Sequence, residues 1–326
     1  MDLVTGATGH IGNVLIRELL KRGKKVRALI LPNEDTASLN GLKVDIAIGN
    51  ILNLDSLIKA FKDVDVVYHL ASIISILSGN EKLIHQTNVV GTQNVIKACF
   101  KCKVKRLLYT SSIHALKEPP HGIIIDESQP FDSYNKRGEY DRSKAKASLE
   151  VLKAVDKGLD TVIICPTGVI GPYDFRISSI GQTIINFVNK KHRFIINGAY
   201  DYVDVRDVAV GHILVCDKGK SGEIYILSGQ RINISNMMKM LEDITKVKAP
   251  HYIIPILLAK ILATFAEIYY KLTKIKPIFT KYTINTLLSN SFISHKKASE
   301  ELGYSPRPIK ESIEDSINWF KEQGIL

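Results

Sequence analysis

Two residues with complementary chemistry, Tyr140 and Lys144, lie four positions apart in a segment, Tyr140–Ala154, that is predicted to be helical. Residues at this spacing share one face of a helix, and a nearby ammonium group favours the ionised phenol. We therefore expect Lys144 to lower the pKa of Tyr140 from its ordinary value of about 10. Tyr140 would then donate and accept a proton near neutral pH.

The position of this pair in the chain distinguishes it from a second pair with the same spacing, Tyr270 and Lys274. Only Tyr140 lies on the helix that follows the predicted strand Arg106–Thr110, which runs on into Ser111 and Ser112. A serine at the carboxyl edge of a parallel sheet can donate a hydrogen bond to a substrate carbonyl oxygen.

A glycine-rich turn near the start of the chain predicts a dinucleotide site. Gly6, Gly9 and Gly12 follow an apolar strand and open a segment with helical periodicity. Such glycines permit a sharp turn, a close approach of the backbone to a pyrophosphate, and close packing of helix on strand. The amide groups of the first helical turn would hold the phosphates.

The elements that position these residues are short, continuously apolar strands alternating with helices. Strands are predicted at Val26–Ile30, Val44–Ile48, Val64–Leu70, Arg106–Thr110 and Thr161–Cys165, with helices at Leu54–Phe61 and Glu81–Cys102 among them. Continuous apolar runs are typical of parallel strands buried on both faces. We predict a Rossmann-type, doubly wound parallel α/β sheet in residues 1–170, to which residues of about 200–227 return. Residues 171–326 would form a smaller, mostly helical substrate lobe.

Taken together, the motifs resemble the extended short-chain dehydrogenase/reductase family over nearly the whole chain. The resemblance rests on the glycine-rich turn, on Tyr109-Thr110-Ser111-Ser112, on Tyr140-Asp141-Arg142-Ser143-Lys144, and on Pro166-Thr167-Gly168-Val169-Ile170-Gly171-Pro172. It implies that Tyr140 is the acid and base, that Lys144 is its partner and a ribose ligand, and that Ser112 anchors the carbonyl. It also implies a homodimer formed through the helix that bears Tyr140.

The resemblance further implies which residues contact the cofactor. These lie in the glycine-rich turn and after the strands that face it: Gly6, Thr8, Gly9, His10, Ile11, Gly12, Asn50, Ile51, Leu70, Ala71, Ser72, Asn88, Thr110, Tyr140, Lys144, Pro166, Thr167, Gly168 and Val169. Of these, Asn88 is expected to be structural rather than catalytic. Leu31 occupies the position where relatives that prefer NADP often have arginine, and Glu34 and Asp35 come late for a ribose ligand. The choice between NAD and NADP is left open.

The branch of the family is indicated by Gly168, which stands where nucleotide-sugar epimerases and dehydratases usually carry an asparagine that contacts the sugar nucleotide. The stretch is more similar to dihydroflavonol-4-reductase-like and 3β-hydroxysteroid-dehydrogenase-like members. The leading hypothesis is an NAD(P)-dependent oxidoreductase that moves a hydride between nicotinamide and a carbonyl or hydroxyl of a small substrate. The apolar segment Ile253–Ile268 would suit an apolar substrate. A sugar epimerase or dehydratase is the alternative, and a cofactor-binding sensor without turnover is a third.

Composition narrows the remaining possibilities. The net charge of +11 is spread along the 326 residues without interleaved aromatic residues, so nucleic-acid binding is not expected. The four cysteines form no disulfide framework and no metal site, which suggests a reducing, cytoplasmic location. Ile253–Ile268 is apolar but short for a membrane span and contains Lys260 and Glu267. We expect a buried or pocket-lining helix there, with membrane contact as the alternative.

Overall fold

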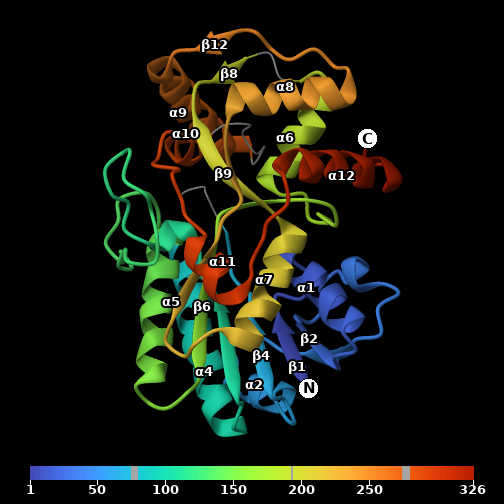
Figure 1. The fold of residues 1–326 in the computed structure, drawn as a ribbon, viewed down its shortest axis with the longest axis vertical. Helices are drawn as coiled ribbons and strands as arrows, with labels where there is room; N and C mark the ends of the chain where they lie inside the picture. Colours follow the sequence, from blue (N-terminus) through green and yellow to red (C-terminus); the bar gives the residue numbers. More distant parts are fainter. Residues whose placement is uncertain (75–79, 192–193, 274–279) are drawn as a thin grey trace.

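The computed structural model describes residues 1–74, 80–191, 194–273 and 280–326, and the side chains of 268–272 are not described. Tyr270 and Lys274, the second pair with the spacing of Tyr140 and Lys144, therefore lie outside the described side chains. Figure 1 shows a large sheet flanked by helices, with a second group of helices and short strands stacked on one end of it.

The central sheet has seven strands, all parallel, in the order β10-β6-β5-β4-β1-β2-β3. This confirms the predicted doubly wound parallel sheet. The strands are β1 (Asp2–Thr5), β2 (Val26–Ile30), β3 (Asp45–Ile48), β4 (Val66–His69), β5 (Arg106–Thr110), β6 (Thr161–Pro166) and β10 (Ile224–Leu227).

Both faces of this sheet are covered, and neighbouring residues of β1 show how. Leu3 packs with one helical layer, α2 (Leu54–Ala60), α4 (Gly91–Cys102) and α5 (Glu139–Val155). Val4 packs with the other, α1 (His10–Lys21), α7 (Val205–Lys218) and α11 (Lys296–Leu302). Because alternate side chains enter two apolar cores, the strands are apolar throughout.

The strand β3 differs from this pattern. It was expected to be buried on both faces, but it is the edge strand, and Ile46 and Ile48 are 45% and 65% exposed. The apolar sequence of β3 resembles that of a central strand, so the sequence pattern alone did not separate an edge from the middle.

Residues 81–102 form one continuous helical segment, as predicted, but it is not uniform. It comprises α3 (Glu81–His85), a π-helical turn at Gln86–Val90, and α4. A π turn inserts an extra residue into a helix and is frequent at functional sites. Here the turn carries Asn88 at the edge of the sheet.

The C-terminal lobe surrounds a separate apolar core that includes Phe187, Tyr202, Met237 and Trp319. It contains two small sheets, β11-β9-β7 and β12-β8. Its elements are β7 (Gly168–Ile170), α6 (Ser179–Val188), β8 (Ile195–Ile196), β9 (Ala199–Asp204), β11 (Gln230–Asn233), α8 (Ile234–Thr245), β12 (Ile253–Ile254), α9 (Ile256–Thr273), α10 (Lys281–Leu287) and α12 (Ile309–Glu322). Within the described ranges, no helix combines the length and the apolar character needed to span a bilayer.

The apolar segment at 253–268 is not the buried helix that we expected. It forms β12 and most of α9, and the large side chains of α9 are exposed, with Leu257 at 74% and Phe265 at 65%. The helix rests on the lobe through Ala259 and Ala263, which are 3% and 1% exposed. The small inward face explains why so little of this apolar helix is covered.

Candidate active site

The glycine-rich turn between β1 and α1 has the geometry of a phosphate cradle. Gly6 has φ +67°, and a Cβ there would lie 2.8 Å from the amide nitrogen of Ala71. A Cβ on Gly12 would collide with the carbonyl oxygen of Gly6. These positions therefore require glycine.

The first turn of α1 can hold an anion. The helix begins at His10 with Gly9 as its N-cap, and no side chain caps it. The backbone N–H groups of the first turn and the positive end of the helix dipole are the ordinary ligands of a pyrophosphate. The residues present thus fit the phosphates of a dinucleotide.

A segment of the C-terminal lobe lies against this turn. His10 Nε2 donates to the carbonyl oxygen of Pro172 at 2.9 Å, and Asn13 Nδ2 donates to that of Tyr173 at 3.2 Å. Arg176 donates to the Thr8 hydroxyl at 2.5 Å and is paired with Glu34. The predicted ligand Thr8 therefore uses its hydroxyl within the protein.

Glu34, which the sequence places late for a ribose ligand, folds back toward the end of β2. Glu34 accepts hydrogen bonds from the backbone of Leu31 at 2.7 Å and from the hydroxyl of Thr8 at 2.5 Å. The carboxylate is folded back because residues 31–34 form a turn in which Asn33 has φ 59° and the Glu34 N–H bonds to the Leu31 carbonyl. Proline followed by asparagine is the signature of such a turn, and that signal was available in Pro32-Asn33.

Asn50, the predicted adenine contact, follows the end of β3. The side-chain oxygen of Asn50 accepts from the N–H of Leu52 at 2.9 Å, which leaves its NH₂ group as the donor. Ile51 packs beneath Gly91, where a Cβ would lie 2.6 Å from its Cδ1 atom. Ile51 thus shapes the floor of this end of the sheet.

A buried chain of hydrogen bonds fixes Leu70 and Ala71 beside the glycine turn. The Thr5 hydroxyl accepts from the N–H groups of Leu70 and Ala71 at 3.2 and 3.1 Å. It lies 2.7 Å from Nδ1 of His69, whose Nε2 is 3.0 Å from the Thr92 hydroxyl. Because burial lowers the pKa of His69 to about 3, this ring is neutral and acts as a structural bridge.

Asn88, in the π turn, holds the segment that follows Ser72. Its side chain accepts from the N–H of Ile73 at 2.8 Å and donates to the Ile73 carbonyl at 3.1 Å. It also donates to Ser143 on α5 at 2.9 Å. This geometry gives Asn88 a positioning function, and residues 75–79 lie outside the described residues.

Ser112, Tyr140 and Lys144 come together at the carboxyl edge of the sheet. Ser112 follows β5, while Tyr140 and Lys144 lie in the first turns of α5, which begins at Glu139. The side chains of Tyr140 and Ser112 lie close enough to interact, and Lys144 Nζ donates to the carbonyl oxygen of Thr110 at 2.5 Å. The three groups that the motifs predicted to be adjacent are therefore assembled by two elements.

The pKa values differ from the expectation. Burial raises the pKa of Tyr140 above its ordinary value, whereas we expected Lys144 to lower it. The ammonium of Lys144 is directed at the Thr110 carbonyl and lies 4.8 Å from the centre of the Tyr109 ring. Burial lowers the pKa of Lys144 to about 7. In this arrangement the phenol is a neutral proton donor, and the lysine can change its charge near neutral pH.

Aromatic residues of the C-terminal lobe border these groups. The ring of His114, two residues after Ser112, stacks on Tyr200 with centres 5.6 Å apart, and the two side chains are hydrogen-bonded at 2.7 Å. Tyr282 on α10 donates to Asp141 at 2.8 Å, next to Tyr140 in the sequence. These contacts attach the lobe directly to the start of α5.

Residues 166–169 lead from β6 into β7 beneath this aromatic group. The hydroxyl of Thr167 donates to Asp201 at 2.6 Å. A Cβ on Gly168 would lie 2.8 Å from the ring of Tyr202 and 2.9 Å from that of Tyr200. A larger side chain at residue 168, such as asparagine, would collide with the two tyrosines.

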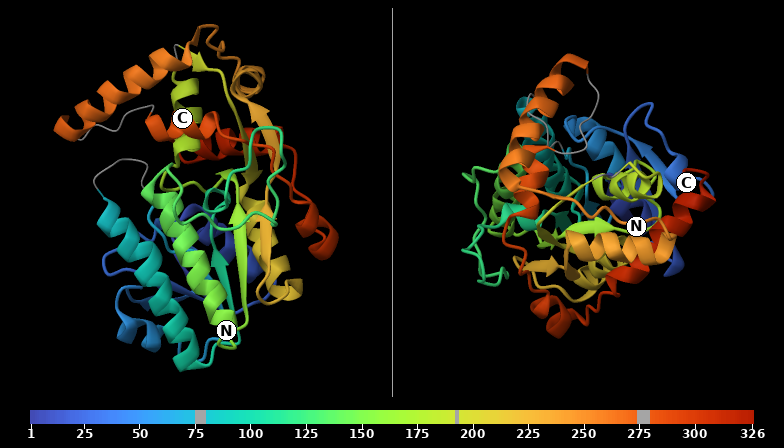
Figure 2. Two further views of the ribbon diagram at one scale, coloured as in Figure 1. Left: turned by 90° about the vertical axis from the view of Figure 1, so that its left-hand side faces the viewer. Right: turned by 90° about the horizontal axis from the view of Figure 1, so that it is seen from above.

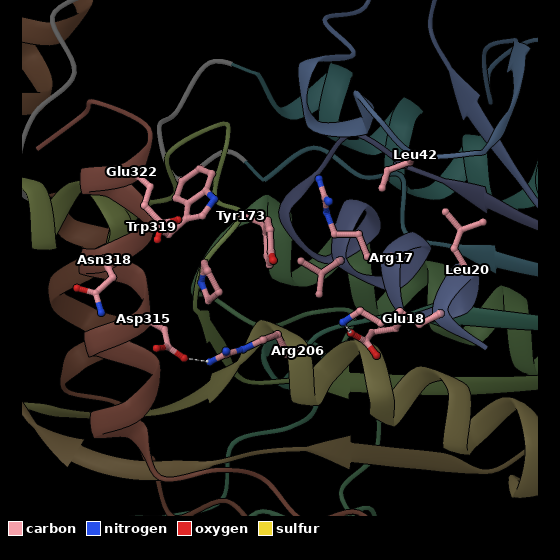
Figure 3. Close-up of a pocket in the computed structure, with 13 residues that line it drawn as sticks. Arg17, Glu18, Leu20, Leu42, Tyr173, Arg206, Asp315, Asn318, Trp319 and Glu322 are labelled. Carbon is pink, nitrogen blue, oxygen red and sulfur yellow. Dashed lines mark hydrogen bonds and ion pairs between the residues drawn. The ribbon is translucent and has the colours of Figure 1, made fainter. Parts of the chain in front are cut away.

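A cavity of about 610 Å³ lies away from these groups, between α1, α7 and α12 (Figure 3). Several of its charged lining residues have partners within the protein: Arg206 pairs with Asp315 at 2.7 Å, and Arg17 lies over the Tyr173 ring at 4.6 Å. None of Ser112, Tyr140 and Lys144 lines it. Within the described ranges, no group of His, Cys, Asp and Glu side chains is arranged to hold a metal ion.

Comparisons with known proteins agree with this geometry. Residues 3–228 match the NAD dependent epimerase/dehydratase family. The chain is 34% identical to sterol demethylase protein B of Methylococcus capsulatus, over 99% of both proteins. It is 29% identical to 3beta-hydroxysteroid-dehydrogenase/decarboxylase isoform 1 of Arabidopsis thaliana, over 98% of this chain and 79% of that protein.

A solved structure extends the match to the fold. The crystal structure of gox2253 superposes with a TM-score of 0.88 at 32% identity, covering 100% of this chain and 99% of that one. The sequence match, the parallel sheet and the assembled Ser112, Tyr140 and Lys144 lead to one conclusion. The chain belongs to the NAD dependent epimerase/dehydratase family and is an enzyme of the extended short-chain dehydrogenase/reductase type.

Proposed function

We propose that the protein oxidises or reduces an alcohol–ketone pair on a largely apolar, ring-containing substrate, with NAD as the cofactor. The observation that carries this proposal is the assembly of Ser112, Tyr140 and Lys144 at the carboxyl edge of the sheet, where α1 also has its uncapped start. The names of the two relatives, a sterol demethylase protein and a hydroxysteroid dehydrogenase, support a ring-containing substrate.

The residues divide the chemistry among them. Ser112 donates a hydrogen bond to the substrate oxygen and so stabilises negative charge there. Tyr140 gives its phenolic proton to that oxygen during reduction and takes it back during oxidation. Lys144 stabilises the phenolate that remains. Nicotinamide, when bound, supplies or accepts the hydride at the substrate carbon.

Two observations favour this activity over the alternatives. Tyr200 and Tyr202 occupy the space that an asparagine at 168 would need, which disfavours a nucleotide-sugar substrate. The proton-donating phenol and the buried lysine are both in place, which disfavours a sensor without turnover.

The test compares Tyr140→Phe and Ser112→Ala with wild type in NAD-linked oxidation of a panel of hydroxysteroids and other cyclic alcohols. We expect Tyr140→Phe to lose about a thousandfold in kcat and Ser112→Ala about a hundredfold. Both variants should bind NADH with unchanged affinity. Full activity of Tyr140→Phe would refute the mechanism, and cofactor that stays bound throughout purification would favour an epimerase.

We infer that Glu34 selects NAD over NADP. A carboxylate at the end of the second strand hydrogen-bonds the ribose hydroxyls of NAD and repels the extra phosphate of NADP. Glu34 occupies that place through its bond to the Leu31 N–H. The hydrogen bonds and the ion pair with Arg176 also hold the pKa of Glu34 below its ordinary value despite partial burial, so it is ionised at neutral pH.

Replacing Glu34 with Gln should raise the KM for NADH about tenfold. It should also reduce the ratio of kcat/KM with NADH to kcat/KM with NADPH. Asp35→Asn is the matched control, because Asp35 caps only the local turn at the N–H of Ala37. Steady-state kinetics with both cofactors would measure the effect. A preference for NADPH in the wild type would contradict this assignment.

The predicted homodimer and the cytoplasmic location also remain proposals. Exposed apolar side chains on the α4–α5 side, among them Val90 and Leu149 at 37% and 36%, support a dimer that uses the helix bearing Tyr140. Light scattering of wild type and Leu149→Asp would test it, since the charge should dissociate such a dimer.

A further inference from the structure

The helix α9 presents its large apolar side chains to solvent. Leu257, Ile261 and Phe265 are 74%, 45% and 65% exposed. Leu258 and Leu262 are 45% and 47% exposed. A helix of a globular protein ordinarily directs its large apolar residues to the core. Here alanines face inward, so the apolar surface of α9 has no partner within the described part of the chain.

The exposed residues form one continuous stripe. Residues 257, 261 and 265, and residues 258 and 262, recur every four positions and therefore lie along one side of the helix. Tyr252 and Ile253, just before the helix, are 78% and 56% exposed and continue the apolar surface toward β12. Figure 2 shows α9 projecting from the end of the lobe that is remote from the central sheet.

The sequence around this stripe is strongly basic. From Ile244 to Ser299 the only acidic residue is Glu267, whose carboxylate accepts from the backbone N–H of Lys281. Before α11, the same stretch contains Lys246, Lys248, Lys260, Lys271, Lys274, Lys276 and Lys281. Lys260 is exposed on α9 itself. An apolar stripe next to lysines matches a surface made of anionic headgroups over hydrocarbon.

We propose that the apolar stripe of α9 docks the enzyme on an anionic lipid bilayer, with the helix lying in the plane of the headgroups. This inference goes beyond the proposed reaction and does not depend on it. A second copy of the chain is a poorer occupant, because two such surfaces would bring like charges together and because lysine is depleted in protein interfaces.

The test is sedimentation of the full chain with vesicles of phosphatidylcholine containing about one third phosphatidylserine. We expect the wild type to sediment with these vesicles and to be released by salt or when phosphatidylserine is omitted. Leu257→Ser/Phe265→Ser should reduce the bound fraction about tenfold or more, since two apolar side chains are lost from the contact.

A matched control removes equally exposed apolar residues elsewhere. Ile46→Ser/Ile48→Ser alters the edge strand β3, where the two isoleucines are 45% and 65% exposed, and should leave vesicle binding unchanged. Lys246→Gln/Lys248→Gln/Lys260→Gln should weaken binding to the vesicles that contain phosphatidylserine. Circular dichroism and NADH binding would verify that each variant is folded.

Three results would overturn the proposal. The wild type could fail to sediment with the vesicles, or the β3 control could lose binding as fully as the α9 variant. Light scattering could also show a wild-type dimer that Leu257→Ser/Phe265→Ser converts to a monomer without any vesicle binding in either protein. Because the readout is membrane binding, none of these results bears on the reaction proposed for Tyr140.

Discussion

Lys144 is the residue whose burial has the clearest energetic consequence. Its side chain is 3% exposed, and its ammonium has the Thr110 carbonyl as its hydrogen-bond acceptor. Burial without a carboxylate partner disfavours the charged form, which is why its pKa falls to about 7. The residue therefore costs stability while it is protonated in the folded protein, and it does so in order to place a cation beside the reacting phenol.

This burial predicts a dependence of stability on pH. Between about pH 7 and the ordinary lysine pKa of about 10.4, Lys144 is protonated in the unfolded chain and neutral in the folded chain. The free energy of unfolding therefore rises with pH across this window. The stability gained at high pH is lost as the pH falls to the folded-state pKa of about 7. Relative to wild type, Lys144→Met should be more stable at pH 6.5 than at pH 10, by about 3 kcal/mol. Urea unfolding at both values would measure this difference, with Lys153→Met on the exposed side of α5 as control. An equal difference at both pH values would contradict the prediction.

Individual residues were predictable where a motif fixed their position. Gly6, Gly12, Ser112, Tyr140 and Lys144 lie where their spacing and order along the chain indicated. The position of the Glu34 carboxylate at the Leu31 N–H could not be predicted, because a count of residues along the chain does not show how a turn folds back. The pKa of Tyr140 was also predicted in the wrong direction, since the depth of burial depends on the whole fold and not on the helical spacing to Lys144.

At the scale of elements, helix α7 depends on the residue at its start. Asp204 caps the helix by accepting from the N–H of Arg206 at 2.7 Å, and its carboxylate also pairs with the guanidinium of Arg206 at 2.8 Å. Asp204 is buried, and the two contacts together hold its pKa below the ordinary value although burial opposes this. Since α7 packs beside α1 on the same face of the sheet, this cap stabilises the helical layer that includes α1.

Asp204→Ala should therefore lower the free energy of unfolding by about 3 kcal/mol, because it removes a cap and leaves a partly buried guanidinium with fewer partners. Asn53→Ala is the comparison, since the Asn53 side chain caps α2 by accepting one neutral hydrogen bond from the N–H of Ser56 at 3.0 Å. That change should cost about 1 kcal/mol. Urea midpoints would rank the two variants, and equal losses would show that the ion pair adds nothing to the cap.

Elements were predicted well where apolar runs were bounded by polar residues, as for β2 and β5, whose limits match the expectation. The sequence pattern gave the wrong indication of burial for β3 and α9. In both, a run of large apolar residues indicated burial, but the partner that would cover the run is missing from the described fold. Whether an apolar element is covered is a property of its neighbours, so its own sequence cannot decide it.

At the scale of the whole molecule, the two parts of the chain meet directly over the cofactor cradle. The backbone of Pro172 and Tyr173 contacts His10 and Asn13 at the start of α1. Behind this segment, Tyr173 and Phe175 pack against Trp319, with ring centres 6.3 and 5.0 Å away. The residues that contact the cradle are therefore also in contact with an aromatic group in the other part of the chain.

This arrangement makes the single tryptophan, Trp319, a reporter of cofactor binding. We expect titration with NAD⁺ to change the intensity or wavelength of tryptophan emission, because Tyr173 contacts both the start of α1 and Trp319. Trp319→Phe should abolish the signal but not the binding, which calorimetry would measure independently. Binding seen by calorimetry with unchanged tryptophan emission would show that the segment stays in place.

The pair between Arg176 and Glu34 also has a consequence for the speed at which cofactor enters. If the carboxylate must leave Arg176 before it meets a ribose, association has a first-order opening step, and the observed rate reaches a plateau at high cofactor concentration. Salt screens the exposed ion pair and should raise that plateau. The same salt slows the initial encounter between the phosphates and a chain of net charge +11. Raising the ionic strength thus slows the encounter of the cofactor with the protein but speeds the opening of the Arg176–Glu34 ion pair. This one ion pair between the two parts of the chain determines which effect limits the rate of binding.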